Sequence, residues 1–178
     1  MLNKQIAEKL EHAFSQHGFA EPSVATLQKL SGVSLRTLYK YYPSKESMIV
    51  AALTNRHQRY LYYFASSSES TGEAWVTSAF EHLSDWMKNS APHGCLSIQA
   101  LAAYPNNVQI AEAVKQHKRD IQQLLAEKSG HPELSEQLFL LHEGIASGWP
   151  IVGDSIIASA NRMVADLFVQ YLKQPKEI

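Results

Sequence analysis

Apolar residues recur at helical spacing along almost the whole chain, and short polar or Gly/Pro-containing stretches interrupt them. In the first such segment, residues 2–17, one face is apolar through Ile6, Leu10, Ala13 and Phe14. Apolar positions three and four residues apart are typical of an amphipathic α-helix. Strict alternation of apolar and polar residues, the pattern of a half-buried strand, is found nowhere in the chain. The pattern therefore predicts an all-α protein.

Two short helices joined by a tight turn are predicted for residues 23–46. Ser23 is a suitable N-cap for the first helix, and Gly32 provides a backbone that can turn sharply after it. Ser34 is a suitable N-cap for the second helix, and Pro43 closes it, because the residue before a proline avoids the helical conformation. Two helices with such a connection make a helix-turn-helix, whose second helix fits the major groove of DNA.

The second of these helices, residues 35–42, carries side chains that suit contact with DNA. Leu38 is the strongly apolar residue in its middle and should face inward, so its polar neighbours point elsewhere. Arg36 offers the paired donors that match the edge of a guanine. Groups able to bind phosphate oxygens come from Thr37, Tyr39, Lys40 and Tyr41. The alternative is a surface helix in a protein-interaction module that shares this shape.

The stretch GVSLRTLYKYYPSKE, residues 32–46, resembles the signature of the TetR (tetracycline-repressor-like) family, which is close to GVS-x-x-TLY-x-YF-x-SKE. The stretch AFSQHGF in the preceding helix resembles the family pattern A-x-x-LF-x-x-x-GY/F. The resemblance covers roughly residues 6–53. There are two departures: Gln28 stands where the family usually has alanine, and Tyr42 replaces the more usual phenylalanine.

This resemblance implies an N-terminal three-helix DNA-binding domain, residues 1–46, and a larger helical ligand-binding and dimerisation domain of about six helices, residues 47–178. It further implies a homodimer that binds a palindromic operator in double-stranded DNA and represses transcription. Base contacts are expected from Arg36, with Thr37 and Tyr39 beside it. The remaining DNA-binding positions, most of them carried over from the family as backbone contacts or their neighbours, are Ser23, Thr26, Ser34, Lys40, Tyr41 and Lys45.

Helical periodicity continues after the motif in six further segments, at residues 44–65, 75–88, 95–104, 106–127, 133–148 and 154–172. The Trp149-Pro150 pair is expected to end the fifth of these. Small residues lie among the apolar ones in the last two segments, and such residues permit close helix approach. Apolar helices at the end of a chain indicate a subunit interface. A homodimer through the last two helices is therefore expected, and charged substitutions at Ile157 or Val164 are expected to break it.

The resemblance also implies a small-molecule effector held in the second domain. Aromatic and polar candidates for its binding indicate an apolar or aromatic compound, and they are Tyr63, Trp86, Cys95, His117, Phe139 and His142. Each has a plainer interpretation: the rings as simple core, the histidines as satisfied core groups, and Cys95 as a small buried residue instead of a thiol sensor. A helix-turn-helix DNA-binding protein without an effector is the alternative function.

Composition narrows the class of protein. The 178 residues carry a formal charge of −1, but residues 1–60 have a net charge of +4 and the remainder −5. Basic charge in the segment that holds the motif suits binding to phosphates. Cys95 is the only cysteine, so an intrachain disulfide is impossible and a reducing cytoplasm is expected. No apolar run approaches 18 residues, which argues against a membrane span.

Spacings typical of catalysis or metal binding are missing from the sequence. No two of the eight histidines lie four apart on a predicted helix, and no HExxH, GxSxG, Walker or CxxC pattern occurs. His82 and Asp85 share a helical face and are expected to be a solvated surface pair. His142 and Glu143 are adjacent, point about 100° apart on a helix, and are not expected to converge. We therefore expect no enzymatic activity, no metal and no cofactor.

Overall fold

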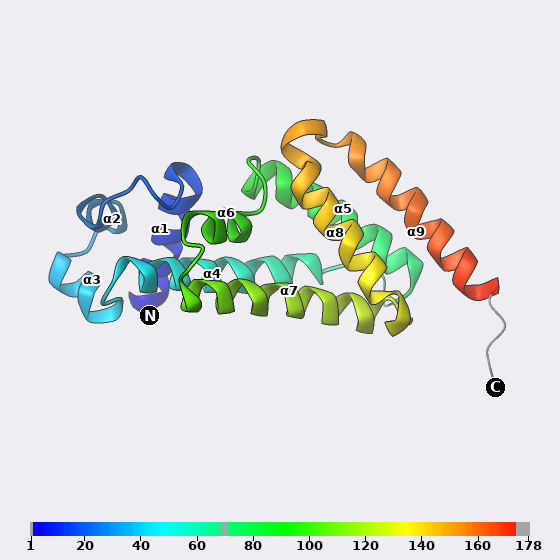
Figure 1. Cartoon of the computed structure of the whole chain (residues 1–178), viewed down its shortest axis with the longest axis horizontal. Coiled ribbons are helices and arrows are strands. Elements are labelled where there is room, and N and C mark those ends of the chain that lie inside the picture. The colour runs from blue at the N-terminus through cyan, green and yellow to red at the C-terminus, as the bar shows by residue number, and fades with distance from the viewer. Residues whose placement is uncertain (1, 68, 70, 174–178) are drawn as a thin grey trace. The chain divides into compact units, whose positions relative to one another are not determined.

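The computed structural model describes residues 2–67, 69 and 71–173, and helices are the only regular structure in them (Figure 1). In chain order these are α1 (Leu2–His17), α2 (Val24–Ser31), α3 (Leu35–Tyr41), α4 (Lys45–Phe64), α5 (Glu73–Ser90), α6 (Leu96–Ala103), α7 (Val108–Lys128), the 3₁₀ helix η1 (Pro132–Leu134), α8 (Ser135–Val152) and α9 (Ser155–Lys173). The predicted all-α fold, with a helix-turn-helix domain before a larger helical one, is confirmed.

The chain divides into two compact units. The first contains the residues up to Tyr60 together with Cys95–Lys118, and the second contains Leu61–Gly94 together with the residues from Arg119 onward. Helices α4 and α7 therefore each begin in the first unit and end in the second. The functional boundary placed at residue 46 remains a prediction of where the DNA-binding part ends.

The first unit has one apolar core, to which α1, α2, α3, α4, α6 and α7 all contribute. Its fully buried members include Leu10, Phe14, Leu27, Leu38, Met48, Ile49, Ala100 and Ile110. Val33, in the turn between α2 and α3, packs half-buried against this core. Because removal of apolar surface from water drives this packing, the position of α3 depends on all of these helices.

The second unit is built on α5, which is buried on two sides. Apolar residues on two sides of this helix lie in the interior, and the exposures are 8% or less for Trp75, Val76, Ala79, Phe80, Leu83, Trp86 and Met87. Helices α5, α8 and α9 contact one another. A helix that is apolar on more than one face needs neighbours on each, and α8 and α9 supply them here.

Helix α8 continues past the point where the sequence predicted its end. It runs through Pro150 to Val152, and Gly153, with a φ of 57°, follows it. Proline removes one helical hydrogen bond, but here the missing bond lies in the last turn. Trp149 is only 7% exposed, so continuation of the helix buries a large ring. The expectation of a break at Trp149-Pro150 is therefore wrong, because tertiary packing outweighs one lost bond.

Candidate nucleic-acid interface

Two serine caps set the directions of α2 and α3, as predicted. Ser23 Oγ accepts a hydrogen bond from the backbone N–H of Thr26 at 3.1 Å, and Ser34 Oγ accepts one from that of Thr37 at 3.1 Å. Between the helices, Gly32 has a φ of 70°, a left-handed conformation that favours glycine. The two helices thus begin and end at the residues that the sequence indicates.

The side chain of Gln28 makes a hydrogen bond across the turn between α2 and α3. Its Nε2 donates to the carbonyl oxygen of Val33 at 2.5 Å, and Ser31 Oγ donates to the carbonyl oxygen of Gln28 at 2.9 Å. The TetR-family pattern usually has alanine at this position, and alanine has no donor to offer. Gln28 therefore replaces close packing by a hydrogen bond across the turn.

Helix α3 presents one apolar residue inward and its polar residues outward. Leu38 is fully buried, whereas Arg36, Tyr39, Lys40 and Tyr41 are exposed. The ammonium of Lys40 lies 5.8 Å from the centroid of the Tyr41 ring, within cation–π range. The outward face therefore combines a guanidinium, an ammonium and two phenol hydroxyls, which are groups that bind base edges and phosphates.

The residues just after α3 tie it to α1 and to the loop that follows α1. Tyr42 Oη donates to the carbonyl oxygen of Asn3 at 2.8 Å, and Lys45 Nζ donates to that of Ala20 at 3.1 Å. Burial raises the pKa of Tyr42, and Tyr41 adds to the shift. The hydroxyl that distinguishes Tyr42 from the usual phenylalanine thus has an acceptor. Lys45 is already engaged with the protein, which the sequence did not indicate.

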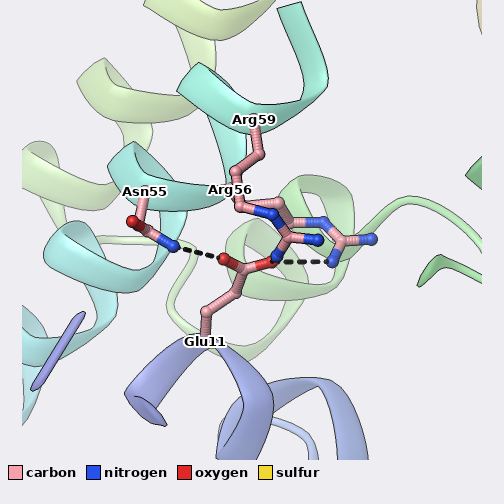
Figure 2. Close-up of polar contacts among 4 residues, drawn as sticks. All are labelled: Glu11, Asn55, Arg56 and Arg59. Carbon is pink, nitrogen blue, oxygen red and sulfur yellow. Dashed lines mark hydrogen bonds and ion pairs between the residues drawn. The ribbon is translucent and has the colours of Figure 1, made fainter. Parts of the chain in front are cut away.

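A buried polar cluster in the same unit was not predicted. Glu11 on α1 accepts hydrogen bonds from Asn55, Arg56 and Arg59 on α4 (Figure 2). Glu11 lies beside the predicted apolar stripe of α1, and glutamate is almost never fully buried unless it is paired. The only signal in the sequence was the grouping of an asparagine and two arginines within two turns of one helix.

The predicted effector-binding residues fall into both units. In the first unit, His117 Nδ1 lies 2.8 Å from His57 Nδ1, and the Tyr60 ring lies 5.7 Å from that of His117. Cys95 precedes α6, and its Sγ lies 3.5 Å from Lys118 Nζ. The structure therefore gives both predicted residues of this unit polar neighbours, and their role toward an effector remains a prediction.

The other four predicted residues form two aromatic groups in the second unit. The His142 ring lies 5.4 Å from that of Phe64 and 6.4 Å from that of Phe139. The Tyr63 ring lies 6.2 Å from that of Trp86. Burial is the larger of the two causes that raise the pKa of Tyr63, and the nearby Asp85 is the other.

Two predictions about histidines are wrong. His82 is not part of a solvated surface pair: its ring lies 5.1 Å from that of Tyr63, and its buried Nδ1 has no hydrogen-bond partner in the protein. His142 and Glu143 do converge, since Nδ1 and Oε1 are 3.0 Å apart. The Cα–Cβ bonds of adjacent helical residues point in different directions, but the glutamate side chain is long and flexible enough to bring its carboxylate to the imidazole ring.

An apolar groove runs between α8 and α9. It has a volume of about 400 Å³ and is lined by Gln137, Leu140, Leu141, Met163, Asp166, Leu167 and Gln170. Leu140 is 69% exposed and Met163 is 53% exposed. Val164, by contrast, is fully buried within its own protomer. A charge at Val164 would therefore act first on the core of the second unit, whereas Ile157 is half-buried, and the expected effect of either substitution on a dimer remains a prediction.

Two negative findings apply to the part of the chain that the structure describes. No three side chains among its histidines, cysteines, aspartates and glutamates are placed to hold a metal ion. None of its helices combines the length and the apolar character needed to cross a membrane.

Residues 6–52 match the model of the family described as bacterial regulatory proteins, tetR family. A TetR-family transcriptional regulator from Streptomyces coelicolor has a similar structure, with a TM-score of 0.83 and 16% identity over 95% of this chain and 89% of that one. The reduced form of NemR from Escherichia coli has a TM-score of 0.74 and 20% identity, over 93% of this chain and 96% of that one. GusR from Salmonella enterica has a TM-score of 0.70 and 21% identity, over 93% of this chain and 94% of that one. No curated protein matches the sequence.

The comparisons agree with the geometry of the first unit. The matched segment begins within α1 and ends within α4, so it contains the capped helix-turn-helix and its outward-facing α3. The similar solved structures extend the shared fold over more than nine tenths of the chain. Residues 6–52 thus match the tetR family of bacterial regulatory proteins, and the chain as a whole shares the fold of solved TetR-family regulators.

Proposed function

We propose that the protein is a one-component transcriptional repressor that binds a palindromic operator as a homodimer. A small apolar or aromatic effector releases it from DNA. The observation that carries the proposal is the outward face of α3, where Arg36, Tyr39, Lys40 and Tyr41 are exposed above the buried Leu38. A bacterial regulator that binds chromosomal DNA acts where that DNA lies, so the proposal places the protein in the cytoplasm.

Arg36 is the residue best placed to read a base. It lies in the first turn of α3 and is exposed, and the N-terminal residues of a recognition helix are those that contact base edges. Its guanidinium can donate two parallel hydrogen bonds to O6 and N7 of a guanine. Ser23, Ser34 and Thr37 lie at the caps of α2 and α3, where helix N-termini favour phosphates.

Replacement of Arg36 by alanine is expected to cost about 1–3 kcal/mol of binding free energy and to relax the preference at one base position. The measurement is the affinity for a set of duplexes in which each operator position is changed in turn. An unchanged preference at every position would show that another residue reads the base.

Lys40→Gln is the matched control for Arg36→Ala. Lys40 is exposed one turn further along α3 and is assigned to phosphates. Its loss should weaken binding to all duplexes about equally and lower the slope of log affinity against log salt by about one. A base-specific effect from this variant would mean that the two roles have been exchanged.

A dimer is required by the geometry of DNA. One recognition helix covers a few base pairs, so two must be held about 34–36 Å apart, or a multiple of that distance, to read a palindrome. The exposed apolar groove between α8 and α9 supports a second copy of the chain as its occupant. Its lining combines leucines and a methionine with polar residues of both helices, which is the composition of an interface with an apolar core and a polar rim.

Two unpartnered polar atoms in the second unit support an effector with hydrogen-bonding groups. Trp75 Nε1 and His82 Nδ1 are buried without a partner in the protein, and such groups are costly unless something satisfies them. Aromatic rings lie beside each of them, with Phe64 against Trp75 and Tyr63 against His82. Apolar walls with a few polar groups are typical of small-molecule sites, which favours an aromatic compound that carries oxygen or nitrogen.

Selection of bound DNA from random duplexes tests the proposal. We expect enrichment of one inverted repeat with half-sites one helical turn, or a multiple, apart. Absence of any enrichment at low ionic strength would overturn the proposed function. The alternative without an effector is tested by a thermal-shift screen of aromatic compounds, since a ligand at 100 times its Kd stabilises the folded state by about 2.7 kcal/mol.

A further inference from the structure

A buried carboxylate joins α1, the helix before the helix-turn-helix, to α4. Glu11 is 3% exposed and points from α1 toward α4 (Figure 2). Asn55 Nδ2 donates to its Oε2 at 2.6 Å, while Arg59 Nη1 and Arg56 Nη1 donate to its Oε1 at 2.7 and 3.3 Å. We call these four residues the Glu11 clamp.

Stability alone does not account for the clamp. Asn55 is 5% exposed and Arg56 is 8% exposed, so a carboxylate, an amide and a guanidinium are all removed from water. An apolar cluster of similar size would avoid that desolvation cost. Burial lowers the pKa of Arg56, and the charge of Glu11 acts against this shift. What a charged cluster provides and an apolar one does not is directional geometry.

That geometry acts on the orientation of the recognition helix. The apolar contacts that α1 makes in the core, through Leu10 and Phe14, are non-directional and tolerate small rotations. Helices α2 and α3 share the same core through Leu27 and Leu38, so they move with α1. Hydrogen bonds to one carboxylate from positions four residues apart on α4, by contrast, fix both the angle and the register of α1.

We infer that Glu11 is a positioning residue for DNA binding, which sets the orientation of α1, α2 and α3 on α4 and thereby the half-site spacing that a dimer accepts. The inference rests on the proposed binding of a palindromic operator. Glu11 itself touches no base or phosphate in this account. It acts through Asn55, Arg56 and Arg59.

Two variants test the inference, with a matched control. Glu11→Gln keeps the shape of the side chain and removes its charge. Arg59→Gln removes the shortest charged contact, and because the Arg59 side chain is 52% exposed and Glu11 keeps Asn55 and Arg56 as partners, this variant should fold. Lys115→Gln is the control for Arg59→Gln, since Lys115 is an exposed residue of α7 in the same unit and its replacement also removes one positive charge.

The measured quantity is the affinity for duplexes that carry the selected operator with its half-sites moved by −1, +1 or +2 base pairs. Each added base pair rotates one half-site by about 34°, since a turn contains about 10.5 base pairs. The wild-type protein and Lys115→Gln should prefer one spacing strongly. In both clamp variants the ratio of affinities for the best and the next spacing should fall about tenfold, because a hydrogen bond to a charged group is worth about that factor.

The outcomes separate the two proposals. If the wild-type protein binds no duplex, the proposed function fails. If it binds and the folded Arg59→Gln variant keeps the wild-type ratio, the inference is overturned. A loss of affinity that is equal at all spacings also overturns it, since that is the effect of destabilisation alone. Circular dichroism establishes which variants fold, and Arg59→Gln decides the question if Glu11→Gln does not.

Discussion

The double variant Leu140→Glu, Met163→Glu is expected to be monomeric and to lose at least about 100-fold in operator affinity. In a dimer, the two introduced carboxylates of one subunit would be removed from water and would lie opposite the same two carboxylates of the other subunit, so desolvation and like-charge repulsion would both oppose association. Both residues line the groove between α8 and α9, and both are more than half exposed in the single chain. The substitutions therefore leave the protomer core intact. Without the dimer, each recognition helix must bind its half-site alone.

Sedimentation or sizing chromatography measures the state of assembly, and titration of the operator measures affinity. Val108→Glu is the control, since Val108 is 79% exposed on α7, outside the proposed interface. This variant should remain dimeric. If the double variant stays dimeric, the subunit interface lies outside the groove between α8 and α9. If it is monomeric but keeps full operator affinity, the requirement for two linked recognition helices is contradicted.

Leu38→Ala is expected to lower the free energy of unfolding by about 2–5 kcal/mol, the usual cost of a cavity in a packed core. Leu38 is fully buried on α3 and belongs to the core that α1, α4, α6 and α7 share. Its partners come from several helices, so the site cannot collapse around the missing atoms by the shift of one element. Urea denaturation followed by circular dichroism measures the change.

Leu30→Ala is the matched control for this second prediction. Leu30 is 42% exposed on α2, so the same chemical change should cost much less there. The base preference of the folded Leu38→Ala protein should be unchanged, since the side chain faces away from the outward surface of α3. Equal destabilisation by the two variants would contradict the assigned inward face.

Local signals in the sequence predicted the DNA-binding motif closely. Ser23, Gly32 and Ser34 act through their own backbone or that of residues within four positions, so their effect does not depend on the rest of the fold. The inward position of Leu38 follows from its being the strongly apolar residue of a short helix. Of the predicted DNA-binding residues, Arg36, Thr37, Tyr39, Lys40 and Tyr41 lie on this one helix.

Contacts between distant parts of the chain could not be predicted in this way. Gln28 and Tyr42 were recognised only as departures from a pattern, and the structure supplies their acceptors, Val33 and Asn3. Pro150 was expected to end a helix, but the packing of Trp149 continues it. His82 was assigned to the surface because periodicity does not show that a ring from another helix covers it.

The sequence by itself determined the helical fold, the helix-turn-helix and the chemistry of its exposed face, because caps, turns and periodicity act over a few residues. Only the tertiary structure decided that a charged residue of α1 is buried against α4, and which apolar residues of α8 and α9 remain on the surface. The physical reason is that burial and ion pairing depend on partners far away in the chain. Glu11 and Arg59 are 48 positions apart, and no local pattern relates them.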